Sequence, residues 1–157
     1  MTKKGVLYLV KMSGIRHYLE GCLTDTNKKR NGEKMEVLYR STRSLEGTVT
    51  ASQAILKGLA EDGGLFVPQQ IPARDVTMDQ LAGMSYQETA FEVMKLFFTD
   101  FTEEELKNCI AKAYDDKFDT KEIAPLKKED GVFYLELFHG ATIAFKDLAL
   151  SILPHLL

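Results

Sequence analysis

The sequence has few cysteines and no long apolar run, and both absences exclude classes of protein. Cys22 and Cys109 are far apart and form no C-x-x-C pair, which argues against a disulfide framework or a zinc site. No apolar run approaches the ~20 residues that a membrane-spanning helix needs. The run Gly5–Val10 is shorter than a signal-peptide core and ends at Lys11. We therefore expect a cytoplasmic protein.

The chain also has no excess of positive charge. A formal net charge of −3 over 157 residues gives no general electrostatic reason to bind nucleic acid, and the composition is typical of about one globular domain. Residues 1–34 differ, with eight Lys/Arg and three Asp/Glu. A basic N-terminal segment followed by an acidic remainder of the chain indicates a binding or targeting arm, an unstructured extension, or residues translated from an upstream start. We expect the domain proper to begin at Met35.

Three segments have the spacing of a capping box, in which a hydroxyl residue is followed three positions later by Glu or Gln. They begin at Thr50, Ser85 and Thr102. Apolar residues follow each one at helical spacing, which predicts three amphipathic helices. The expected helix faces are Ala54, Ile55, Leu56 and Leu59; Ala90, Phe91, Val93, Met94, Phe97 and Phe98; and Leu106, Cys109, Ile110, Ala113 and Tyr114.

Strands are expected at three places. Val37–Tyr39 and Leu65–Val67 are short, and the helix between them is about long enough to return the chain, so we expect them to pair. Lys127–Gly131 is typical of a solvated turn. Val132–Phe138 then has the pattern of a largely buried strand.

The segment His139–Asp147 places Lys146 after this strand, at the start of an apolar run. If residues 144–155 form one helix, Lys146 shares a face with Ala149, Leu150 and Leu153. Burial would favour its free amine, which can attack an aldehyde carbonyl. The pattern alone also fits a surface lysine whose stem packs on the protein. His139 would then be a turn residue, Thr142 a helix cap and Asp147 a partner of the helix dipole.

Three segments resemble one known family. Leu137–Asp147, with the sequence LFHGATIAFKD, closely resembles the pyridoxal-phosphate lysine motif of the threonine synthase family. Ala51–Pro68 is similar to that family's N-terminal signature, and Tyr39–Arg43 to its opening strand. The family usually has proline where this chain has Ala141, a change that touches no reactive atom.

The resemblance implies a chemistry. Lys146 would be the catalytic residue and would hold pyridoxal 5'-phosphate as an internal aldimine, with Phe145 packed near the cofactor. The cofactor acts as an electron sink, and the released lysine moves protons. The family is a lyase of threonine biosynthesis that converts O-phospho-L-homoserine and water to L-threonine and phosphate. No metal is implied.

The implied fold class is α/β: a mostly helical N-terminal lobe with a short strand pair, then the first strand and helix of a truncated fold-type-II pyridoxal-phosphate catalytic domain. We assign residues 1–34 to an extension, 35–122 to the N-terminal domain and 123–157 to the start of the catalytic domain. The phosphate-binding loop is expected beyond Leu157, because Gly63-Gly64 leads into a strand and is typical of a turn.

Two other functions remain open. The chain could be a folded but catalytically incomplete module, or a related lyase for another phosphorylated amino acid. In either case, an exposed apolar helix at residues 144–157 would favour self-association.

Limited proteolysis tests the first domain boundary. We expect cleavage within residues 1–34 and resistance after Met35, because proteases cut where the backbone is not held by packing. Protection of the backbone of residues 1–34 would rule the boundary out.

Overall fold

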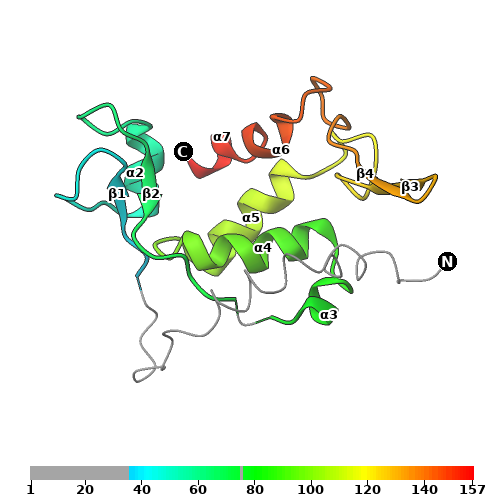
Figure 1. The fold of residues 1–157 in the computed structure, drawn as a ribbon, viewed down its shortest axis with the longest axis horizontal. Helices are drawn as coiled ribbons and strands as arrows, with labels where there is room; N and C mark the ends of the chain where they lie inside the picture. The colour runs from blue at the N-terminus through cyan, green and yellow to red at the C-terminus, as the bar shows by residue number, and fades with distance from the viewer. Residues whose placement is uncertain (1–35, 75) are drawn as a thin grey trace.

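The computed structural model describes residues 36–74 and 76–157, so the predictions for residues 1–34, including Cys22, lie outside it. The elements are β1 (Tyr39–Ser41), α2 (Ala51–Lys57), β2 (Phe66–Pro68), α3 (Met78–Leu81), α4 (Tyr86–Phe97), α5 (Glu103–Ala113), β3 (Leu126–Glu129), β4 (Val132–Leu135), α6 (Asp147–Leu150) and α7 (Leu153–Leu156). Figure 1 shows α4 and α5 across the middle, with β1, β2 and α2 at one end and β3 and β4 at the other.

The three predicted helix starts are confirmed. At each, the capping hydroxyl accepts from the N–H three residues on, and the Gln or Glu there reaches back to the capping residue's own N–H. Two otherwise unpaired donors are thereby satisfied at every start. A fourth capping box, Thr77 with Gln80, opens α3. The predicted extent of α2 is wrong in one respect: Gly58 caps its C-terminus, so Leu59 lies outside the helix.

The predicted pairing of the first two strands is also confirmed. β1 and β2 are antiparallel, with Tyr39 opposite Pro68 and Ser41 opposite Phe66. The predicted turn before β2 is held by Asp62, whose Oδ1 accepts from the hydroxyl of Ser41 at 2.7 Å and from the N–H of Gly64 at 2.8 Å. The carboxylate therefore joins the turn to the strand that it faces.

The prediction for residues 127–138 is confirmed in part, because a strand begins at Val132 and a turn precedes it, but the predicted turn is too long and the predicted strand is neither as long nor as buried as expected. Leu126–Glu129 is a strand, and it pairs antiparallel with Val132–Leu135. Between the strands, Asp130 and Gly131 have φ values of 49° and 81°, the backbone of a two-residue hairpin turn for which Asp-Gly is a strong signal. The strand that begins at Val132 ends at Leu135. Leu135 is 58% exposed, because a two-stranded hairpin leaves much of its surface to solvent.

The predicted helix over residues 144–155 is also wrong. Two one-turn helices, α6 and α7, replace it, and Pro154 occupies the first turn of α7. Proline has no N–H to donate within a helix, and its ring disfavours a helical residue before it. The expected long apolar helix is therefore not formed, and self-association through this segment stays a prediction. No described helix has both the length and the apolar character that a membrane span requires.

The main core lies on one face of α5. Leu106, Ile110 and Ala113 are each at most 2% exposed. Residues of α4 and of α6–α7 pack against this face, and Phe98 also contacts a second, smaller cluster around β1 and α2. The hydroxyl of Tyr39 donates to the carbonyl of Phe97 at 3.0 Å. The two parts of the lobe therefore meet at the end of α4.

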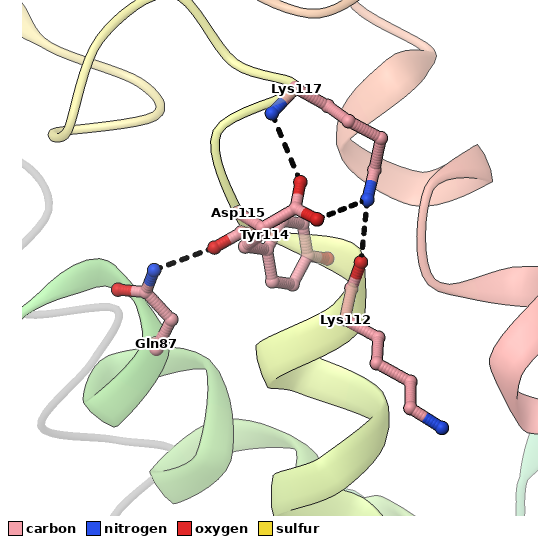
Figure 2. A network of polar contacts seen from close by, with 5 residues as sticks. All are labelled: Gln87, Lys112, Tyr114, Asp115 and Lys117. Atoms are coloured by element: carbon pink, nitrogen blue, oxygen red, sulfur yellow. Dashed lines mark hydrogen bonds and ion pairs between the residues drawn. The ribbon is translucent and has the colours of Figure 1, made fainter.

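A polar network fixes the direction in which the chain leaves α5 (Figure 2). Gln87 of α4 donates to the carbonyl of Tyr114 at 2.7 Å. The amine of Lys117 donates to the carbonyl of Lys112 at 2.8 Å and to Asp115 at 2.5 Å. Hydrogen bonds from Lys117 hold the pKa of Asp115 below its usual value. Carbonyls that the helix end leaves without partners are thus satisfied.

Replacing Leu106 by alanine should test this core. The side chain is 1% exposed, and the substitution should lower the free energy of unfolding by about 2–5 kcal/mol, because apolar contacts are lost and a cavity remains. Urea unfolding followed by circular dichroism measures the change. Leu56→Ala is the matched control: Leu56 is 67% exposed, and its loss should change stability by less than about 0.5 kcal/mol. Equal effects would contradict the core described here.

Candidate functional site

Lys146 lies on an exposed loop. Residues 141–146 are all exposed, and Lys146 directly precedes the first residue of α6. The ring of Phe145 is 65% exposed. The prediction of a lysine on the buried apolar face of a long helix is therefore wrong, because the chain before Asp147 forms turns instead of a helix. The loop presents the amine and the aromatic ring to the outside.

The carboxylate of Asp147 holds this loop from within. Asp147 is 7% exposed. Its Oδ2 accepts from the N–H of Thr142 at 2.8 Å, and its Oδ1 accepts from the hydroxyl of Thr142 at 2.6 Å. These bonds hold the pKa of Asp147 below its usual value. Thr142 therefore does not cap the helix. Both of its donors bind the side chain that follows Lys146.

Gly140 packs directly on the same carboxylate. A Cβ at Gly140 would lie 2.5 Å from both the Cβ and the Oδ2 of Asp147, so only glycine allows this approach. The N–H of Ile143 donates to the carbonyl of Gly140 at 3.0 Å. Ile143 has a φ of 62°, a backbone conformation that is rare for a β-branched residue. The loop is thus a compact turn closed over Asp147.

Contacts with α5 anchor the two short helices behind the loop. The hydroxyl of Tyr114 donates to the carbonyl of Leu148 at 2.7 Å, and burial raises the pKa of that hydroxyl. Ile152 is 5% exposed within the main core. The thiol of Cys109 contacts the carbonyl of His155 at 2.9 Å. Cys109 is buried and free, which confirms the prediction that it packs on the helix.

His139 lies on the other side of the loop, as a hydrogen-bonded residue. Its ring nitrogens contact Asp119 and Glu136. Neither carboxylate was predicted to be a partner of His139. Glu136 stands three positions before His139, a spacing that could have indicated the pair, but Asp119 is brought in by the loop after α5 and has no local sequence signal.

The double glycine is not part of this site. Gly63 and Gly64 form the turn before β2, as predicted, and a Cβ at Gly64 would lie 2.0 Å from the hydroxyl of Ser41. They therefore meet a strand and do not open a helix. Within residues 36–74 and 76–157, no group of three or more His, Cys, Asp or Glu side chains is placed to hold a metal ion.

The chain matches known proteins over most of this structure. The family model described as threonine synthase N terminus matches residues 38–114. Threonine synthase of Eremothecium gossypii is 42% identical over 132 residues, 78% of this chain and 26% of the relative. Among solved structures, the pyridoxal-phosphate-bound threonine synthase of Brucella melitensis has a TM-score of 0.68 at 36% identity, covering 76% of this chain and 26% of that one. Threonine synthase from yeast has a TM-score of 0.68 at 38% identity, covering 76% and 25%.

These similarities confirm the predicted class, an α/β protein with a mostly helical N-terminal lobe and the fold-type-II architecture of its solved neighbours. The chain belongs to the threonine synthase family, and it matches the N-terminal part of that family's members. It spans about a quarter of the length of the curated relatives that it matches.

Gly140→Ala should disrupt the loop that carries Lys146. The added Cβ would displace the Asp147 carboxylate and so break its bonds to Thr142. We expect the free energy of unfolding to fall by about 1–3 kcal/mol, with faster hydrogen exchange at the Thr142 amide.

The matched control is Gly83→Ala. A Cβ there would lie 3.5 Å from the carbonyl of Gln80, an ordinary contact, and stability should change by less than about 1 kcal/mol. If Gly140→Ala left both stability and Thr142 exchange unchanged, the close packing on Asp147 would not be what holds the loop.

Proposed function

We propose that this chain supplies the lysine to which a threonine synthase attaches pyridoxal phosphate. Lys146 is that lysine, and the reaction is the conversion of O-phospho-L-homoserine and water to L-threonine and phosphate. The observation that carries the proposal is the exposed Lys146 on a loop closed over Asp147, within the segment that resembles the family's cofactor motif.

The residues of the loop fit such a cofactor. An aldehyde needs an accessible primary amine, and Lys146 is exposed. An aromatic cofactor ring needs an apolar surface beside it, and the ring of Phe145 is 65% exposed on the same loop. Donors for the phosphate group are normally found in a glycine-rich loop at a helix N-terminus, and the described part of the chain offers none. Attachment is therefore the part of the site that these residues provide.

Four residues of the loop have a specific role in this proposal. When bound, pyridoxal phosphate supplies an electron sink for the bonds of the substrate's α-carbon. Lys146 holds the cofactor through Nζ and, as a free amine, accepts and donates protons. Phe145 orients the ring and excludes water from one side. Thr142 and Asp147 fix the backbone from which Lys146 projects.

The domain assignment is part of the same proposal. Residues 35–122 form the N-terminal domain, and the family match at residues 38–114 lies inside this range. Residues 123–157 begin the catalytic domain. The cytoplasmic location stays a prediction.

A second candidate function is a folded module that does not catalyse the reaction alone. The observation that favours it is length, since the chain spans about a quarter of its relatives. We propose that the isolated chain releases no phosphate from O-phosphohomoserine.

Reductive labelling tests the attachment. The full chain is incubated with pyridoxal phosphate and reduced with borohydride, and the modified residues are mapped by mass spectrometry. We expect Lys146 to be labelled in preference to the other lysines, because it is exposed on a loop whose backbone Thr142 and Asp147 hold in one conformation. Lys146→Ala should abolish this label. Lys128→Ala is the matched control, since Lys128 is an exposed lysine of β3, and it should leave the labelling of Lys146 unchanged.

Two results separate the candidates. Labelling scattered evenly over many lysines would reject Lys146 as the attachment site. Labelling of Lys146 without phosphate release from O-phosphohomoserine would support attachment by a chain that does not catalyse the reaction alone. Phosphate release that Lys146→Ala abolishes would overturn the second candidate.

A further inference from the structure

The imidazole of His139 lies between two carboxylates from different segments. Its Nδ1 is 2.5 Å from Oδ1 of Asp119, in the loop after α5, and its Nε2 is 3.0 Å from Oε2 of Glu136, just after β4. The side chain is 14% exposed. A ring held at both nitrogens has little freedom to rotate.

The main chain reinforces the same contact. The N–H of Asp119 donates to the carbonyl of His139 at 3.1 Å, and the ring of Phe138 lies 4.6 Å from the imidazole between centroids, tilted by 30°. The residue next along the chain is Gly140, which packs on Asp147. His139 therefore fixes the loop at its first residue, as Asp147 fixes it at its last.

We propose that His139 is a positioning residue for Lys146: its imidazole ties the start of the lysine loop to Asp119 and Glu136 and so holds the loop in the orientation described here. The positioning of Lys146 for cofactor rests on the proposed function. The contacts of His139 with Asp119 and Glu136, which we call the clamp, do not depend on that function.

The clamp depends on the charge of the ring. Both nitrogens can donate to carboxylates only when the imidazole is protonated, and the hydrogen bonds that the ring makes to Glu136, first, and to Asp119 raise the pKa of His139 above its ordinary value. Among the described residues, Glu122 is also close enough to His139 for the positive charge of the ring, together with that of Lys127, to help lower the pKa of its carboxylate. Each of the two direct partners is negative, so both favour the imidazolium.

The direction of the pH effect follows from the raised pKa. The imidazolium contributes fully to the stability of the folded loop at pH values below about 6.5, the pKa of histidine in an unfolded chain. This contribution is lost as the pH rises through the higher pKa that His139 has in the folded chain. The side chain of Glu136 is 23% exposed and that of Asp119 is 75% exposed. Since solvent weakens exposed pairs, Glu136 should matter more than Asp119 despite its longer distance.

Nuclear magnetic resonance of the full chain without cofactor tests the proposal. The ring of His139 is titrated, and hydrogen-exchange protection is measured at the Thr142 and Asp147 amides, which are hydrogen-bonded within the loop. We expect both protection factors to fall about tenfold as the pH rises. The midpoint of this fall should equal the midpoint at which the ring of His139 loses its proton. The midpoint should shift downward in Glu136→Gln and, by less, in Asp119→Asn.

Variants and controls make the outcome decisive. His139→Gln should lower loop protection at acidic pH and remove its pH dependence, whereas His155→Gln, at an exposed histidine of α7, should change neither. The Tyr39 amide, bonded to Val49, reports the distant lobe and should stay constant in protection. If His139→Gln does not fold, the wild-type titration and Glu136→Gln decide instead.

The two proposals fail in different ways. Loop protection that is independent of pH in the wild type, or unchanged in His139→Gln, would overturn the positioning role whatever the labelling of Lys146 shows. Protection that follows His139 in a chain whose Lys146 takes no pyridoxal phosphate would support the clamp and reject the proposed function.

Discussion

Burial of one face of α5 is the constraint on which the rest of the described structure depends. The helix carries three acidic residues in its first turn, which suit the positive end of its dipole, and it presents Leu106, Ile110 and Ala113 inward. α4 covers this face from one side, and Ile152 reaches it from the C-terminal segment. Among the described residues, the one-turn helices α6 and α7 bury apolar side chains against this face, whereas β1 and α2 bury theirs in the smaller cluster that Phe98 joins to it.

The loop of Lys146 depends on this packing indirectly. Tyr114 at the end of α5 holds the carbonyl of Leu148, which is the residue after Asp147. The position of Asp147 is therefore set by the core, and the position of Thr142 by Asp147. A buried carboxylate left without donors would be destabilising, so Asp147 selects the loop conformation that supplies them. A continuous series of contacts therefore runs from the core through Asp147 to the loop that carries the exposed Lys146.

Local signals in the sequence predicted the elements that depend on local interactions. The capping boxes at Thr50, Ser85 and Thr102 predicted helix starts correctly, because both hydrogen bonds of each box form between residues only three positions apart. The missed features had signals too: Asp130-Gly131 for the hairpin and Pro154 for the helix break. The contacts of Asp119 with His139 and of Gly140 with Asp147 could not be predicted, because each depends on how separate segments pack.

The exposure of Lys146 means that the site relies on orientation and not on burial of the amine. Apolar periodicity predicted a lysine activated by burial, but the described chain leaves Lys146 exposed and instead fixes the backbone on both sides of it. Orientation of a reacting group can contribute as much to a reaction as a change in its environment, because it removes the entropy lost on bringing the groups together. A lysine that stands on a rigid turn and reaches into solvent can meet a cofactor held by other parts of a protein. A buried lysine would first have to be uncovered.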